Sequence, residues 1–124
     1  MKKIVILVAL LLIDFSLHAQ DFKSADAEMN QIYQQVLKKY NDNPQFIEKF
    51  KTSQRAWLKF RDAQLEAMYP SPDKQKAYGS AYPTCEADML LELTGARTKQ
   101  LRVWLDGIEE GDVCAGSVKR RESK

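Results

Sequence analysis

The chain has 124 residues, of which 19 are lysine or arginine and 17 are aspartate or glutamate, so its formal net charge is +2. This near-neutral balance gives no electrostatic case for binding nucleic acid or an anionic membrane surface. The chain has one histidine, His18, and two cysteines, which leaves few residues for metal or nucleophile chemistry.

Residues 1–19 have the pattern of a secretory signal peptide. A basic start at 1–3 is followed by ten apolar residues at 4–13, and Ala19 supplies the small residue of a cleavage site. Ten apolar residues are too few to span a bilayer as a helix, which takes about 20. We expect cleavage after Ala19, or else after Gln20, with export to the periplasm or the medium; a retained N-terminal anchor is the alternative. No cysteine follows the apolar run, so no lipid anchor is expected.

Cleavage removes His18 and leaves residues 20–124, which are enough for one domain with its own core. Without an imidazole, this mature chain lacks the base that activates serine and cysteine nucleophiles, and it lacks a histidine ligand for zinc. A pair of carboxylates could serve a glycosidase, but Glu86 and Asp88 are two positions apart on an expected helix and do not face each other. We therefore expect a protein that is not an enzyme and that uses no cofactor or metal.

The spacing of apolar residues predicts an all-α fold, a small antiparallel three-helix bundle. The helices are expected over about 25–41, 44–68 and 84–106, followed by a tail at 107–124 that we interpret as a solvated turn. Ser24 is the expected N-cap of the first helix. Asn43 suits the N-cap of the second, with Pro44 at its first position. Gly95 is a weak point inside the third helix.

A long loop of about 14 residues is expected between the second and third helices, and long loops in small domains are often functional. It carries Tyr69, Tyr78, Gly79 and Tyr82 beside two lysines. Exposed aromatic side chains are typical anchors of protein interfaces, so this loop is the candidate binding loop. The alternative is that its tyrosines pack over the ends of the helices.

Cys85 and Cys114 are the only cysteine pair, and a disulfide is the default expectation in an oxidising compartment. The third helix rises about 32 Å after Cys85, and the extended tail back to Cys114 reaches about 27 Å. An intrachain bridge therefore requires the tail to run straight back along the helix, or the helix to end early or break near Gly95. The alternatives are an interchain bridge or two free thiols.

A polar motif lies in the middle of the second helix. Gln54, Trp57 and Arg61 share one helical face because they are three and four positions apart, and Asp62 follows. This face is either a core tryptophan with an arginine that extends to solvent or a buried polar network. Arg97 lies among apolar neighbours in the third helix, and it could join the same network.

This motif resembles that of the LprI-type lysozyme inhibitor family of small bacterial envelope proteins. The similar residues are Asp26, Met29, Asn30 and Tyr33; Gln54, Arg55, Trp57, Arg61, Asp62 and Ala63; Tyr78, Gly79, Ser80 and Cys85; and Leu93, Thr94, Arg97 and Leu101. The resemblance implies a small helical domain that binds host lysozyme, with motif residues that are structural. Many members carry a cysteine at the position of Leu65, which would pair with Cys85, so the cross-link of this chain departs from the family's commoner pattern.

The expected function is that of a periplasmic or secreted binding protein that blocks a muramidase by protein–protein contact, with Tyr78 or Tyr82 as anchor. The alternative is a general envelope interaction module that binds another envelope protein or peptidoglycan. The near-neutral charge counts against the first reading, because an acidic inhibitor would better suit a basic lysozyme.

Overall fold

A computed structural model describes residues 21–122, and their regular structure is helical apart from a single bridge between Ile108 and Arg120. The predicted all-α class is therefore confirmed. The signal peptide expected at 1–19 lies outside the described residues.

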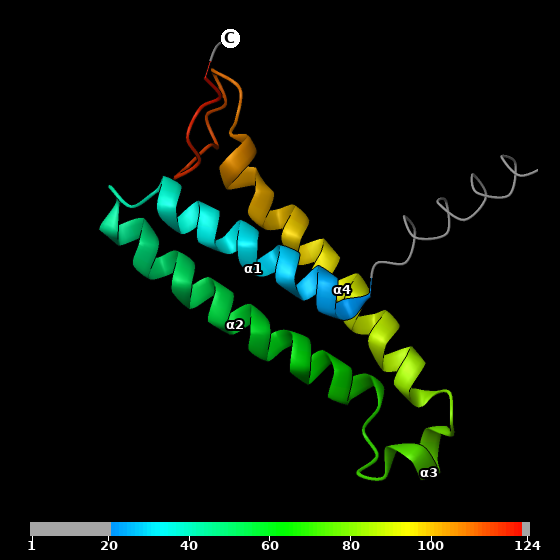
Figure 1. Cartoon of the computed structure of the whole chain (residues 1–124). Coiled ribbons are helices and arrows are strands. Elements are labelled where there is room, and N and C mark those ends of the chain that lie inside the picture. Colours follow the sequence, from blue (N-terminus) through cyan, green and yellow to red (C-terminus); the bar gives the residue numbers. More distant parts are fainter. Residues whose placement is uncertain (1–20, 123–124) are drawn as a thin grey trace, which may run out of the picture.

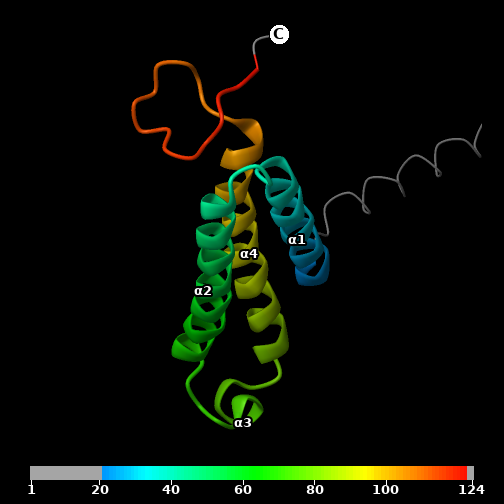
Figure 2. The same cartoon turned by 90° about the vertical axis from the view of Figure 1, so that its left-hand side faces the viewer.

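Three long helices lie side by side, and a short fourth helix lies at one end (Figure 1). In chain order they are α1 (Phe22–Lys39), α2 (Pro44–Met68), α3 (Lys74–Tyr78) and α4 (Tyr82–Asp106). α1 and α4 point in one direction and α2 in the other (Figures 1 and 2). Because α2 and α4 have 25 residues and α1 has 18, α2 and α4 project past the start of α1. We call this projecting part, residues 62–94, the distal arm.

Helix ends follow local capping chemistry, and one expected cap is wrong. Asp21, not Ser24, caps α1: its carboxylate accepts a 2.8 Å hydrogen bond from the Ser24 amide, so the helix begins at Phe22. Asn43 caps α2 by accepting from the Phe46 amide at 3.1 Å, as its sequence predicts.

The core has small side chains where α1 meets α4 and large aromatic side chains beside α2. α1 packs most extensively on α4, where Ala25, Thr94 and Thr98 are small and buried, so the two backbones can approach closely. Large side chains fill the space between α2 and its neighbours. Their ring centroids lie 4.7 Å apart for Tyr40–Phe46, 5.1 Å for Phe46–Phe50, 5.3 Å for Phe50–Trp104 and 5.4 Å for Tyr33–Phe50. Each buried phenylalanine contributes roughly 1.5–3 kcal/mol through removal of apolar surface from water.

The tail after α4 is tied to α1 by Tyr40, and most of its residues are exposed, as expected of a solvated turn. The Tyr40 hydroxyl donates to the Trp104 carbonyl oxygen and accepts from the Lys119 amide, both at 2.9 Å. The Lys119 ammonium lies 4.8 Å from the centroid of the Tyr40 ring and pairs with Asp42 at 3.2 Å. Gly107 has φ 74° and lies so close to the tail that a Cβ there would be 2.9 Å from the Lys119 carbonyl oxygen.

The expected intrachain disulfide is not present: Cys85 and Cys114 are both exposed and unpaired. The reason is geometric. α4 continues unbroken through Gly95, which keeps Cys85 in the distal arm. The tail meanwhile turns back at the opposite end of the molecule, where Lys119 binds Tyr40, and this leaves Cys114 far from its expected partner.

Candidate functional site

The sequence motif forms a polar layer around Trp57. The guanidinium carbon atoms of Arg61 and Arg97 lie 5.5 and 5.9 Å from the centroid of the Trp57 ring, a separation typical of cation–π contacts. The structure has features of both alternatives, the core tryptophan and the polar network. Trp57 is half-buried, and the two arginines contact its ring.

Arg97 is the most deeply buried cation of this layer, with 9% of its surface exposed. Its Nε donates to Gln54 Oε1 at 3.0 Å, and its two terminal nitrogens donate to Ser53 Oγ and Gln100 Oε1 at 3.2 Å each. Removal from water lowers its pKa. These acceptors are neutral, and among the described residues no carboxylate pairs with Arg97. Arg97 therefore links α2 to α4 through hydrogen bonds instead of an ion pair.

Arg61 has acidic partners and links α2 to α1. It bonds Asp26 Oδ1 at 3.2 Å and lies 3.5 Å from Asp62 Oδ1. Its guanidinium also lies 5.3 Å from the centroid of the Phe22 ring. The motif residues are therefore brought together between helices, and we interpret their role as structural.

The candidate binding loop forms a compact cluster at the end of the distal arm. The ring centroids lie 5.2 Å apart for Tyr69–Tyr78 and for Tyr69–Tyr82, and 6.0 Å apart for Tyr78–Tyr82. The Tyr78 hydroxyl accepts a hydrogen bond from the Ser71 amide at 2.9 Å. Gly79 has φ 74°, a conformation that favours glycine, where the chain turns out of α3. The three tyrosines are half-buried, so they pack on one another and remain partly accessible to solvent.

Charged groups surround this tyrosine cluster. Lys74 donates to Glu66 at 2.9 Å and to the Tyr69 carbonyl oxygen, and the bond to Glu66 raises the pKa of Lys74. Burial, together with the neighbouring Cys85, raises the pKa of Tyr69. Burial and the nearby Glu86 raise the pKa of Tyr82. At neutral pH the phenols of Tyr69 and Tyr82 are therefore uncharged, and Lys74 is a cation.

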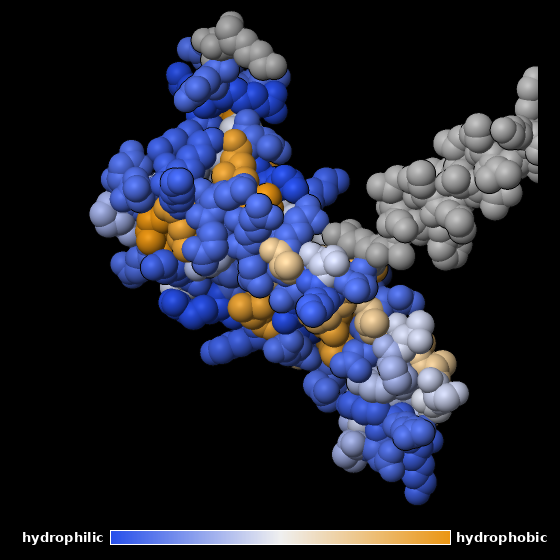
Figure 3. All heavy atoms as spheres, viewed as in Figure 1, coloured by the Kyte–Doolittle hydropathy of each residue, from blue (hydrophilic) through white to orange (hydrophobic). Residues whose placement is uncertain are grey.

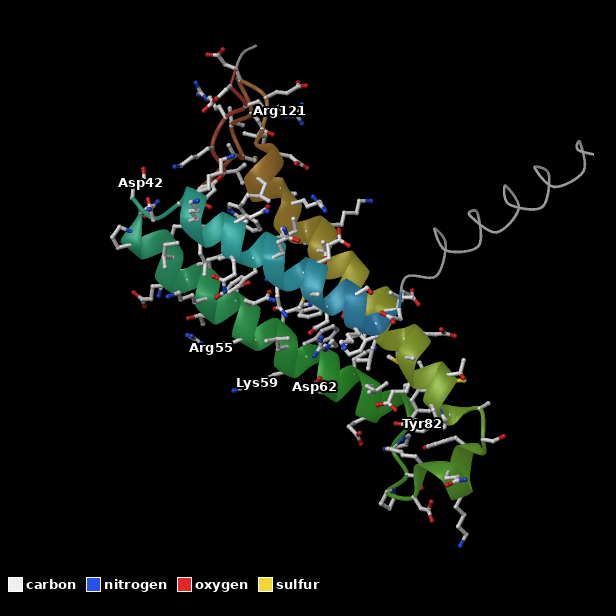
Figure 4. All side chains as sticks on the ribbon, in the orientation of Figure 1. Asp42, Arg55, Lys59, Asp62, Tyr82 and Arg121 are labelled. Atoms are coloured by element: carbon white, nitrogen blue, oxygen red, sulfur yellow. The ribbon has the colours of Figure 1, made fainter. Side chains whose placement is uncertain are left out.

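The distal arm is strongly acidic although the chain is not. Residues 62–94 carry six carboxylates and two lysines, a formal charge of −4, whereas the whole chain is +2. The carboxylates are Asp62, Glu66, Asp73, Glu86, Asp88 and Glu92. Basic side chains gather elsewhere: Arg55 and Lys59 project from the middle of α2, and Arg121 lies at the end of the molecule opposite Tyr82 (Figure 4). A charge count by segment would have revealed this separation from the sequence.

The face of the molecule that Figure 3 shows is largely hydrophilic, and apolar side chains are visible on it in small, separate patches. Within residues 21–122, no three histidine, cysteine, aspartate or glutamate side chains are grouped so as to hold a metal ion. No helix in the same part of the chain is long and apolar enough to cross a membrane.

Comparison with known proteins places this helical chain in a family. The family model described as lysozyme inhibitor LprI matches residues 15–101, and the chain belongs to this family. An uncharacterized protein of Rhizobium meliloti (strain 1021) is 32% identical over 101 residues, which cover 73% of this chain and 70% of that protein. No solved structure matches the chain significantly. The family match ends at Leu101, so the tail that Tyr40 holds lies beyond the matched residues.

Proposed function

We propose that this protein inhibits a lysozyme-like muramidase by direct protein–protein contact outside the cytoplasm, and that the distal arm is its binding end. The observation that carries the proposal is membership of the lysozyme inhibitor family over residues 15–101. An inhibitor of this kind binds its target and has no catalytic groups of its own. The expected signal peptide is consistent with this location.

The shape of the distal arm supports its assignment as the binding end. The ends of α2 and α4 project past α1, and α3 lies at the tip between them (Figure 2), so a partner can reach this end of the molecule. The mutual packing of Tyr69, Tyr78 and Tyr82 fixes these side chains before binding. Preorganised aromatic anchors lose little conformational entropy on association.

The charge of the distal arm supports the same assignment. Averaged over the chain, the charge is unsuited to a basic lysozyme, but the −4 of residues 62–94 is complementary to one. The basic residues of α2 and of the tail lie away from this end (Figure 4). The near-neutral net charge is therefore no objection to the proposal.

A cell-wall lysis assay tests the proposal. Purified residues 20–124 are titrated against muramidases of several classes, and stoichiometric loss of lysis is expected for at least one. Replacement of Tyr78 and Tyr82 by alanine should abolish inhibition, whereas Tyr33→Ala, an aromatic truncation outside the arm, should preserve it while the protein stays folded by circular dichroism. No inhibition of any class at large excess would refute the proposal. Full inhibition by the doubly substituted protein would refute the tyrosine cluster as anchor.

Peptidoglycan is the second candidate partner, and one observation favours it. A hollow of about 370 Å³ beside Tyr82 is lined by Lys74, Gln75, Gly79, Ser80, Tyr82 and Pro83. An aromatic ring beside amide and hydroxyl groups suits a saccharide. Co-sedimentation of the mature protein with insoluble peptidoglycan, lost in Tyr82→Ala, would support this function in place of muramidase binding.

A further inference from the structure

A second hollow on the distal arm lies between α2 and α4, apart from the one beside Lys74 and Gly79. Its volume is about 400 Å³, and it is lined by Gln64, Met68, Tyr69, Asp88, Met89, Glu92 and Leu93. Met68 is 57% exposed. Met68, Met89 and Leu93 give the hollow an apolar floor.

Two carboxylates stand beside this apolar floor. Asp88 and Glu92 are four positions apart on α4, so they are neighbours on one helical face. Like charges at this spacing destabilise a helix slightly. In residues 21–122 neither carboxylate forms an ion pair, and no basic residue lines the hollow. Lys74, a basic residue of the same arm, is already bonded to Glu66 at 2.9 Å.

We infer that this hollow receives a lysine or arginine side chain from a basic partner protein. The methylene stem would lie over Met68, Met89 and Leu93, and the cationic head would reach Asp88 and Glu92. Lysine and arginine commonly bury their stems along apolar surface while the charge binds a carboxylate. The inference rests on the proposed function, and it specifies how the muramidase is recognised: by a cationic side chain beside its cleft.

The test compares two doubly substituted proteins that carry the same change in net charge. Asp88→Asn with Glu92→Gln neutralises the hollow. Glu109→Gln with Glu110→Gln neutralises two exposed carboxylates of the tail, outside the distal arm. Affinity for a muramidase that the wild type inhibits is measured by calorimetry at low and at high salt. Thermal unfolding confirms that all proteins are folded, and removal of the Asp88–Glu92 repulsion should leave stability unchanged or slightly raised.

The hollow variant should lose affinity by at least about tenfold, whereas the tail variant should stay within about twofold of the wild type. Affinity of the hollow variant should also fall less with added salt, because the lost contact is ionic. Equal affinity of the hollow variant and the wild type would overturn the inference and leave the proposed function standing. Equal losses in both variants would also overturn it, because the effect would then be long-range. Failure of the wild type to bind any muramidase would instead refute the proposed function, and this inference with it.

Discussion

The Nε of Arg97 on α4 donates a 3.0 Å hydrogen bond to Oε1 of Gln54 on α2, and both side chains are buried. The Gln54 amide nitrogen in turn lies 3.6 Å from the Met29 sulfur on α1. One glutamine thus contacts both other long helices at the level of Trp57. A neutral partner for a buried guanidinium is costly to lose, because the charge then has one acceptor fewer inside the protein.

A double-mutant cycle should show that Gln54 and Arg97 act together. Gln54→Leu removes an acceptor from a buried cation and should lower the free energy of unfolding by about 2–3 kcal/mol. Arg97→Met should also destabilise, because it leaves the Gln54 carbonyl oxygen unpaired. The double variant should be less destabilised than the two singles combined, by about 1–3 kcal/mol. Urea unfolding followed by circular dichroism measures each value, and strict additivity would show that the two side chains are independent.

The Tyr40 hydroxyl group should contribute measurably to holding the tail against the helices. Tyr40→Phe removes the oxygen that bonds both the Trp104 carbonyl and the Lys119 amide, so it should cost about 1–2 kcal/mol of stability. It should also speed tryptic cleavage after Lys119, Arg120 and Arg121. Tyr33→Phe keeps the ring that stacks on Phe50 and serves as the control. Unchanged cleavage in Tyr40→Phe would mean that the other contacts of the tail, among them the Lys119–Asp42 pair and the backbone bonds to Ile108, are enough to hold it.

Local signals in the sequence predict local structure well. The start of α2 is predicted from Asn43 and Pro44 because a cap and a first-turn proline act within a few residues. α3 is missed because five residues are too few to show a helical period.

Local sequence signals do not predict contacts between segments that are far apart in the chain. Tyr40 and Lys119 are 79 positions apart, and nothing in either segment points to the other. The hollow between α2 and α4 could not be predicted from the sequence for the same reason. Asp88 and Glu92 are recognisable as neighbours on one helix, but the apolar floor of the hollow includes Met68 from α2.

Gly95 should be a site of easy stabilisation. It lies within α4 and is exposed, and a Cβ there would meet no atom within 4 Å. Gly95→Ala should therefore raise the free energy of unfolding by about 0.5–1 kcal/mol, since alanine loses less backbone entropy in a helix. Urea unfolding checks this value. Destabilisation would show that α4 bends at Gly95 in solution.

Both cysteines should be free to react in the native protein. Cys85 and Cys114 are exposed and unpaired, so a thiol reagent should modify two sites per chain without denaturant, and a reductant should leave the melting temperature unchanged. Mass spectrometry counts the modified thiols. A folded chain that resists modification and is lighter by two hydrogens would contradict the structure, whereas a reducible dimer on a gel would reveal the interchain bridge that the sequence leaves open.

Alkaline pH should loosen the tyrosine cluster of the distal arm. Burial raises the pKa of Tyr69 and of Tyr82, so the folded state favours the neutral phenols. Their contribution to stability is complete below the unfolded value of about 10 and is lost as pH rises from there through the raised folded pKa values.

Replacement of Tyr69 and Tyr82 by phenylalanine should therefore reduce the alkaline loss of stability. Part of the loss should persist, because burial also raises the pKa of Tyr33 in the aromatic layer between α1 and α2. Urea unfolding at a series of alkaline pH values measures both proteins. Identical pH dependence in the two would mean that the cluster opens before its tyrosines ionise, and the distal arm would then lack the rigidity that makes it a preorganised binding end.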